Sequence, residues 1–200
     1  MLETIGEIIP FYLEHHKDLD SRIHSRPLNE IDIDELFEFG LSGEYLSFLH
    51  KFRIEDTSIG QAFVLDIRPY SQVLLIDKLK EYFRVRNSDY KPVHISSYQS
   101  GYVQVSSFDG GQILLKQGKH KHNESAVYMW ETSSGHFEAI EKISDSYEKF
   151  ILTNANFDKI YDEEIHENDY DKHETDCYRI IDYFNPDLSD SGRDLWRWLI

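Results

Sequence analysis

Two pairs of side chains in this sequence could hold a transition metal. His120 and His122 flank Lys121 in a polar stretch, and His173 and Cys177 are four residues apart, a spacing that two zinc ligands use on a helix. Structural zinc sites usually have a second pair of ligands, and the sequence provides none for either pair. We therefore predict a hairpin tip at 120–122 and no bound metal at either pair.

Carboxylates are concentrated in the run DEEIHENDYDKHETD, residues 162–176. Asp169 and Asp171 have the alternate spacing of a calcium loop, but the run lacks the glycine and the closing glutamate of such a loop. Asp169 and Asp176 also lie near His173 and Cys177 in the sequence. The default interpretation of the run is a solvated surface, and we predict no bound calcium and no cofactor.

Catalytic signatures are absent from the sequence. It contains no G-x-S-x-G, no phosphate-binding P-loop, no H-E-x-x-H and no dinucleotide fingerprint. Cys177 lies among acidic residues, which disfavour its thiolate and make it a poor nucleophile. The pair Gly110-Gly111 lies between two predicted strands, which is typical of a hairpin turn and not of a phosphate loop. We predict that the protein is not an enzyme.

The net charge restricts the class of partner. The chain has 200 residues, with 21 basic and 37 acidic side chains, a net charge of −16 and a pI of about 4.9. Such a surface repels phosphate backbones, so we predict no direct binding of nucleic acid. It attracts basic proteins and speeds their approach. The alternative is that the charge only keeps the protein in solution.

The sequence indicates a cytoplasmic protein. Its single cysteine cannot form an internal disulfide, which is typical of a reducing compartment. The first residues, MLETIGEIIPF, lack the basic segment of a secretory signal. No apolar run approaches the roughly 20 residues of a membrane span. We therefore predict no interaction with a membrane.

The pattern of apolar residues predicts an α+β fold. Helical spacing runs through 2–19, with Pro10 bending or restarting the helix, and through 30–39 and 43–52. Short runs rich in β-branched and aromatic residues follow, with glycines between them. The predicted strands are 61–67, 72–76, 93–98, 102–108, 112–116 and 126–131. Their short links predict a central antiparallel or mixed sheet flanked by helices.

A further helix is expected over 144–152, with Asp145 as its N-cap and Glu148 as the capping-box partner. We predict that residues 1–153 form one domain, made of helices over 1–52, the sheet over 61–131 and this helix. Residues 154–200 are predicted to form an acidic, aromatic-rich C-terminal extension packed on the same domain. Within it, 175–184 could form a helix, and Leu195, Trp196, Trp198 and Leu199 are expected to be tucked against the body.

The extension has the composition of a protein-binding surface. Residues 154–194 hold 13 acidic and 4 basic residues, with aromatics interleaved among the acids. Acidic groups steer a basic partner, and desolvated aromatics give tight binding. Alternatively, the aromatics pack on the body and the acids only face water. The residues predicted to contact the partner are Tyr161, Asp162, Glu163, Glu164, Glu167, Asp169, Tyr170 and Asp171.

Three stretches of the sequence together resemble the SUKH superfamily of bacterial immunity proteins and eukaryotic scaffold proteins. LSGEYLSFL (41–49) is similar to the opening helix of that family. VSSFDGGQILL (105–115) with AVYMW (126–130) is similar to its central strands, and ISDSYEKFI (143–151) to the helix after the sheet. Ser42 stands where the family usually has proline. The Asn-Gly-Gly often found after the first helix is missing from this chain.

The resemblance covers about residues 30–152 and implies a SUKH-like α+β fold that binds without catalysis. Many members of the family neutralise a cognate polymorphic toxin, often a nuclease. It therefore implies an immunity protein that binds a basic, nuclease-type toxin directly. The alternative is a regulatory or scaffold protein of the same fold that binds an endogenous partner.

Overall fold

The computed structural model describes thirteen stretches of the chain. They are residues 1–15, 23–24, 45–46, 48, 53–54, 57–60, 65–67, 74–75, 102–108, 111–116, 126–131, 140–164 and 170–197.

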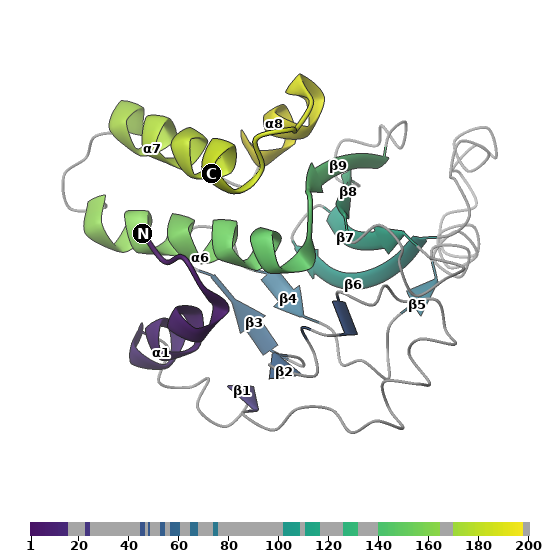
Figure 1. Cartoon of the computed structure of the whole chain (residues 1–200), viewed down its shortest axis with the longest axis horizontal. Helices are drawn as coiled ribbons and strands as arrows, with labels where there is room; N and C mark the ends of the chain where they lie inside the picture. Colours follow the sequence, from purple (N-terminus) through teal and green to yellow (C-terminus); the bar gives the residue numbers. More distant parts are fainter. Residues whose placement is uncertain are drawn as a thin grey trace, which may run out of the picture.

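An antiparallel sheet is the centre of the described structure (Figure 1). Its strands follow the order β3-β4-β6-β7-β8-β9, with β5 also paired to β6, and every described pairing is antiparallel. The strands are β3 (Thr57–Ile59), β4 (Leu65–Ile67), β5 (Leu74–Leu75), β6 (Tyr102–Phe108), β7 (Gly111–Lys116), β8 (Val127–Glu131) and β9 (Ile140–Ser144). Two short strands, β1 (Ile23–His24) and β2 (Arg53–Ile54), form a separate pair.

Both faces of the central strands are buried. One face joins the main core through alternate residues such as Val103, Ile113 and Met129. The other face carries a second cluster on or next to β6, β7 and β8, and no described helix contributes to it. Its members are Tyr102, Leu114, Ala126, Tyr128 and Trp130. Burial on both faces agrees with the consecutive apolar residues ILL of β7 and VYMW of β8.

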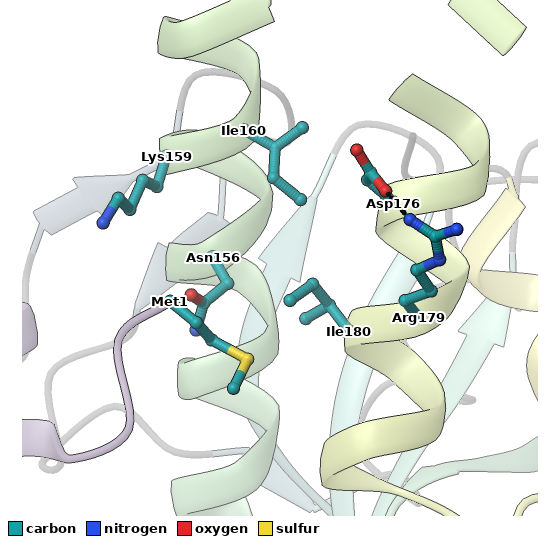
Figure 2. A pocket seen from close by; sticks show the side chains of 7 residues that line it. All are labelled: Met1, Asn156, Lys159, Ile160, Asp176, Arg179 and Ile180. Carbon is teal, nitrogen blue, oxygen red and sulfur yellow. Dashed lines mark hydrogen bonds and ion pairs between the residues drawn. The ribbon is translucent and has the colours of Figure 1, made fainter. Parts of the chain in front are cut away.

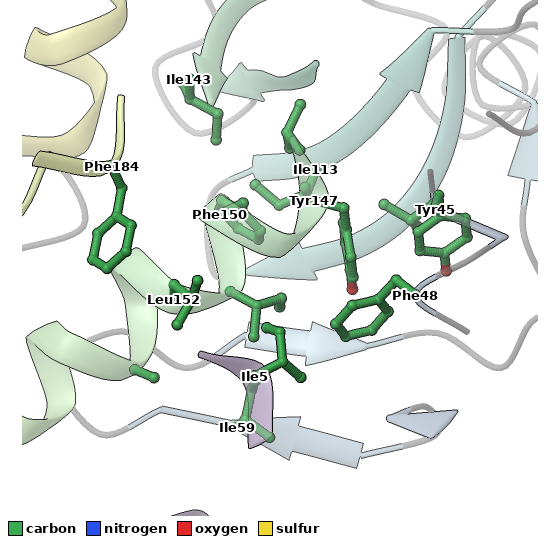
Figure 3. Close-up of a cluster of buried hydrophobic side chains, with 14 of the residues drawn as sticks. Ile5, Tyr45, Phe48, Ile59, Ile113, Ile143, Tyr147, Phe150, Leu152 and Phe184 are labelled. Carbon is green, nitrogen blue, oxygen red and sulfur yellow. The ribbon is translucent and has the colours of Figure 1, made fainter. Parts of the chain in front are cut away.

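Helix α6 (Tyr147–Glu164) runs through the middle of the molecule, between α1 (Ile5–His15) and α7 (Tyr170–Phe184) (Figure 1). All its described residues from 150 to 158 are buried. The apolar ones pack on the sheet and on neighbouring helices (Figure 3). Asp158, also buried, accepts a hydrogen bond of 2.8 Å from the Tyr12 hydroxyl of α1. Burial, reinforced by the Asp158 carboxylate, raises the pKa of Tyr12 well above its ordinary value.

Helices α6 and α7 are fastened to the sheet by Asn185, which is completely buried. Its side-chain oxygen accepts hydrogen bonds from Ser144 Oγ (2.6 Å) and the Asp145 backbone (3.1 Å), at the end of β9. Its amide group donates to Thr153 Oγ1 of α6 at 3.2 Å. One polar side chain at the end of α7 therefore joins a strand and two helices.

Helix α8 (Asp190–Trp196) covers the edge of β9. Trp196 is fully buried, and its Nε1 donates to the Ile143 carbonyl at 2.8 Å. Its ring packs on Phe150 and Phe157 of α6, with centroids 5.6 and 5.3 Å away. The burial expected for Trp196 is confirmed, and the tryptophan also satisfies a carbonyl of an edge strand.

The predicted α+β class and antiparallel sheet are confirmed. The strand predicted over 102–108 is observed as β6, and those over 112–116 and 126–131 as β7 and β8, within one residue. Only parts of 61–67 and 72–76 are described, and these parts are β4 and β5. Phe108 pairs with Gly111, which confirms the hairpin predicted there. The strand at 93–98 and the helix at 30–39 lie outside the described residues.

Helical predictions in the N-terminal half agree where residues are described. Tyr45, Leu46 and Phe48, within the predicted helix 43–52, are helical and buried. The segment predicted over 2–19 contains α1, which continues through Pro10.

The helix predicted over 144–152 was wrong at both ends. Ile140–Ser144 is strand β9, and the helix that follows spans Tyr147–Glu164. Its N-cap is Ser146, whose Oγ accepts a hydrogen bond of 3.1 Å from the Lys149 backbone, so the prediction of Asp145 was also wrong. Asp145 instead pairs with Lys142 (2.6 Å) and Lys149 (3.1 Å). Although partial burial opposes the shift, these lysines hold the pKa of Asp145 below its ordinary value.

The predicted boundary between 153 and 154 falls inside α6. Thr153 and Asn154 are both buried, and α6 continues to Glu164. The helix foreseen at 175–184 is α7, which begins five residues earlier at Tyr170. Because α7 and α8 bond to β9 and α6, they are built into the same core as the sheet.

The close contact of α8 with β9 predicts that a methyl group added at Gly192 lowers the stability of the protein. A Cβ at Gly192 would lie 2.3 Å from the Lys142 carbonyl, so Gly192→Ala must shift the backbone and should lose about 1–3 kcal/mol. At Gly6, in α1, the nearest atom is 3.8 Å away, and Gly6→Ala should gain about 0.5–1 kcal/mol. Urea unfolding measures both. Equal effects would contradict the observed packing of α8.

The burial of Tyr147 predicts that the protein loses stability at alkaline pH. Burial raises the pKa of Tyr147 from 10.0 to about 12, with the Ser106 hydroxyl opposing the shift. The folded state therefore favours the protonated phenol, and its contribution, complete below pH 10, is lost as the pH rises through 12. The parent should lose roughly 2–3 kcal/mol more than Tyr147→Phe between these values, measured by urea unfolding.

The comparison at pH 7 is the control for this variant. Neither Tyr147 OH nor Ser106 Oγ has a hydrogen-bond partner of ordinary geometry among the described residues. Because Tyr147→Phe removes a buried hydroxyl without such a partner, the variant should be more stable than the parent at pH 7, by up to about 1–3 kcal/mol. The same alkaline loss in both proteins would show that Tyr147 is not the titrating group.

Candidate functional site

The predicted partner-binding residues that the structure describes lie towards one end of the helix pair α6–α7. Asp162, Glu163 and Glu164 are the last residues of α6, and Tyr170 and Asp171 are the first of α7. The two helices run in opposite directions side by side (Figure 1), so these two groups lie at the same end. We call it the acidic end. Glu167 and Asp169 lie outside the described residues.

Tyr161 is partly buried and packs against α7. Its ring lies edge-on to His173, with centroids 6.2 Å apart and an interplanar angle of 73°. His173 Nε2 is 3.8 Å from the sulfur of Cys177, which is completely buried. The ring of Tyr161 therefore contributes to the contact between the helices. This agrees with the alternative interpretation of the sequence, in which the aromatics pack on the body.

Ion pairs neutralise part of the charge along α7. Asp176 pairs with Arg179 at 2.6 Å, and Asp182 pairs with Arg193 of α8 at 2.7 Å. Arg197, after α8, lies 3.7 Å from Glu174. Its Nε also donates to the Tyr178 hydroxyl, and this hydrogen bond raises the pKa of Arg197 above its ordinary value. The pairs of Arg193 and Arg197 hold α8 and the residue after it against α7, and each of these exposed pairs contributes little stability.

A cleft of about 220 Å³ lies between α6 and α7 (Figure 2). Ile160 of α6 and Ile180 of α7 project into the space between the helices. The residues that line it are Met1, Asn156, Lys159, Ile160, Asp176, Arg179 and Ile180. Asn156 has a structural role, because its side chain makes two hydrogen bonds with the Leu2 backbone. The cleft therefore combines an apolar surface with three charged side chains, Lys159, Asp176 and Arg179, of which the last two are paired with each other.

The residues considered as metal ligands are only partly described. His173 and Cys177 face each other, as their spacing predicts, whereas Asp176 is paired with Arg179. His120, His122 and Asp169 lie outside the described residues. Within the described stretches, no three His, Cys, Asp or Glu side chains are grouped to hold a metal ion.

Sequence analysis did not identify the cleft. Four of its lining residues form two pairs that are spaced four apart, 156 and 160 on α6 and 176 and 180 on α7. That spacing shows that each pair shares one face of its helix. The sequence does not show that these two faces meet, because the register between antiparallel helices depends on their anchoring at Asn185 and on side-chain packing.

Comparison with known proteins did not identify a family. No protein-family model matches the chain, and no curated protein matches its sequence. The SUKH resemblance therefore stays a prediction. Among the helices of the described residues, none is long and apolar enough to cross a bilayer.

The burial of Cys177 predicts an unreactive thiol. Its side chain is 0% exposed, so a thiol reagent reaches it only when α7 opens. We expect dithionitrobenzoate to react at least roughly 100-fold more slowly with the native protein than with the protein in urea. Because Cys177 is the single cysteine, the reaction reports on one site. Reaction of the native protein at the rate of a free thiol would contradict this packing of α7.

Proposed function

We propose that this chain is a cytoplasmic, non-enzymatic binding protein that holds a basic protein at its acidic end. In its most specific form, it is an immunity protein that neutralises a cognate nuclease-type toxin by direct binding. The observation that carries the proposal is the balance of 13 acidic to 4 basic residues over 154–194, on helices anchored in the core. The SUKH resemblance of residues 30–152 supports the toxin as the partner.

Charge at the end of α6 favours a cationic partner. Asp162, Glu163 and Glu164 occupy its last turn, which has no basic residue. The C-terminus of a helix carries a negative partial charge, so carboxylates there are repelled by the unpaired carbonyl groups. A lysine or arginine from a partner would relieve this repulsion. The acidic end is thus held in an arrangement that binding of a cation stabilises.

Anchoring at the opposite end of the pair prepares this surface for binding. Asn185 ties the end of α7 to β9 and to Thr153 of α6. Two helices fixed in this way present their side chains without first having to be ordered. Less entropy is therefore lost on association than for a disordered acidic segment.

Neutralisation of a nuclease would follow from electrostatic competition. A nuclease site is basic because it holds phosphates, so an acidic protein can occupy it in place of the nucleic acid. Long-range attraction speeds the encounter, and side chains that lose water on binding, such as Tyr170, would slow dissociation. No chemistry on the part of the acidic protein is needed.

Capture followed by an activity measurement tests the proposal. The immobilised chain is exposed to an extract of its source cells, and the bound protein is purified and assayed for nuclease activity. We expect a basic nuclease whose activity disappears when one equivalent of this chain is added. A captured protein that keeps its activity when saturated would contradict neutralisation. An endogenous partner without toxic activity would favour a scaffold protein.

Charge reversal locates the contact on that complex. Glu163→Lys, Glu164→Lys and Asp171→Lys together should slow association by about tenfold or more and weaken its salt dependence. The matched control reverses three exposed acids at the other end of the helix pair, Glu148, Asp187 and Asp190. Both triple variants change the net charge by the same amount. Equal association rates, measured by stopped flow, would place the interface away from the acidic end.

Tyr170 is the aromatic side chain to test at this surface. If it is an anchor that loses water on binding, Tyr170→Ala should mainly increase the dissociation rate, by roughly tenfold or more. Circular dichroism of the variant checks that α7 is intact. A parental dissociation rate would mean that this ring is not part of the interface.

A further inference from the structure

Exposed apolar side chains gather beside the cleft between α6 and α7. Among the described residues, the exposed large hydrophobic side chains are Met1 (49%) and Tyr183 (57%). Met1 lines the cleft itself. Tyr183 follows Arg179 and Ile180 by four and three residues, so it projects from the same side of α7, one turn beyond these two lining residues. The cleft and this exposed aromatic ring are therefore neighbours on one surface.

The lining of the cleft suits a neutral side chain with an apolar body and a polar tip. The cleft has a volume of about 220 Å³, below the roughly 300–1,000 Å³ of sites for whole ligands. Ile160 and Ile180 supply its apolar surface (Figure 2). Because its charged groups are of both signs and Asp176 is paired with Arg179, the lining selects neither a cation nor an anion. A tyrosine fits, since its ring is apolar and its hydroxyl can donate to a carboxylate.

The cleft and Tyr183 have the positions that a two-fold contact requires. In such a contact the same patch serves both copies, so a projecting side chain and the hollow that receives it must lie on one patch. Two copies of α7 can pack antiparallel about a two-fold axis at the level of Ile181. Tyr183 of each copy then lies opposite Arg179 and Ile180 of the other, at the rim of the cleft.

Exposed charges next to Tyr183 complement each other in the same arrangement. The side chains of Arg179 and Asp182, three residues apart, are 75% and 50% exposed. In the antiparallel pair, Arg179 of each copy faces the carboxylate of Asp182 and the ring of Tyr183 in the other, and both attract a guanidinium. The pairs that these two charges make within one chain are exposed and weak, so they compete little.

We propose that the chain forms a two-fold dimer through this side of α7, in which Tyr183 of each copy enters the cleft of the other. The ring packs on Ile160 and Ile180, and the hydroxyl donates to the carboxylate of Asp176. The two acidic ends lie at opposite ends of the antiparallel pair, because each contains the start of its own α7. The inference goes beyond the proposed function and does not depend on it, since both acidic ends stay outside this contact.

Sedimentation equilibrium of the full-length chain tests the dimer. We expect a reversible monomer–dimer equilibrium that becomes tighter from low to physiological salt, because salt screens the repulsion between two copies of net charge −16. Tyr183→Ala should weaken dimerisation by about tenfold or more, because the aromatic anchor is lost. The matched control Tyr178→Ala changes a tyrosine on the side of α7 that contacts Arg197, and should leave dimerisation unchanged.

Two charge reversals separate a specific contact from long-range repulsion. Arg179→Glu makes the chain more negative and Asp182→Lys makes it less negative, so net charge alone would give opposite effects. In the proposed dimer each variant places like charges opposite each other, and each should weaken dimerisation by about fivefold or more. The two changes together restore opposite charges and should bring dimerisation back to within about twofold of the parent. Circular dichroism checks that the helices of each variant are intact.

Three results would overturn the inference. The first is a chain that stays monomeric up to about 1 mM at physiological salt. The second is a dimer that Tyr183→Ala leaves unchanged, because another surface would then join the copies. The third is a dimer that Asp182→Lys strengthens, because repulsion and not this contact would then decide the association.

Discussion

The hydrogen bonds of one buried asparagine decide how the helices meet the sheet. Asn185 accepts from Ser144 and the Asp145 backbone, donates to Thr153, and is itself completely buried. A buried amide that loses such partners costs about 1–3 kcal/mol for each unsatisfied group. The end of α7, the end of β9 and the middle of α6 therefore have one relative placement that satisfies all of them. The packing of Trp196 against Ile143 and α6 is built on that placement.

This anchoring separates the part of the helix pair that gives stability from the part that we propose for binding. Near Asn185, α6 and α7 are surrounded by the core. At the other end, Asp162, Glu163 and Glu164 form the end of α6, and Tyr170 and Asp171 begin α7. Buried polar groups thus fix the geometry of the helix pair, and the acidic end, which we propose for binding, lies away from them. The cleft beside Asp176 lies along the same pair of helices.

Much of the sheet could be predicted from sequence, because β6, β7 and β8 are rich in aromatic and branched apolar residues and are bounded by glycine or polar residues. Strand β9 could not, since Glu141 and Lys142 stand between Ile140 and Ile143 in a pattern that also suits a helix. The length of α6 was missed because burial on all sides removes the two-faced pattern of a surface helix. The acidity of the candidate site is readable from composition, whereas its cleft depends on the register of two helices.

Hydrogen exchange under native conditions tests most directly whether α7 and α8 belong to the same cooperative unit as the sheet. If Asn185 and Trp196 join them as described, the slowest amides of α7, around Ile181, should open with the same free energy as those of β7 and β8, around Leu114 and Met129. All of them should match the global free energy of unfolding. Exchange of the α7 amides at a free energy lower by more than about 2 kcal/mol would show that this helix opens separately, and would contradict the account.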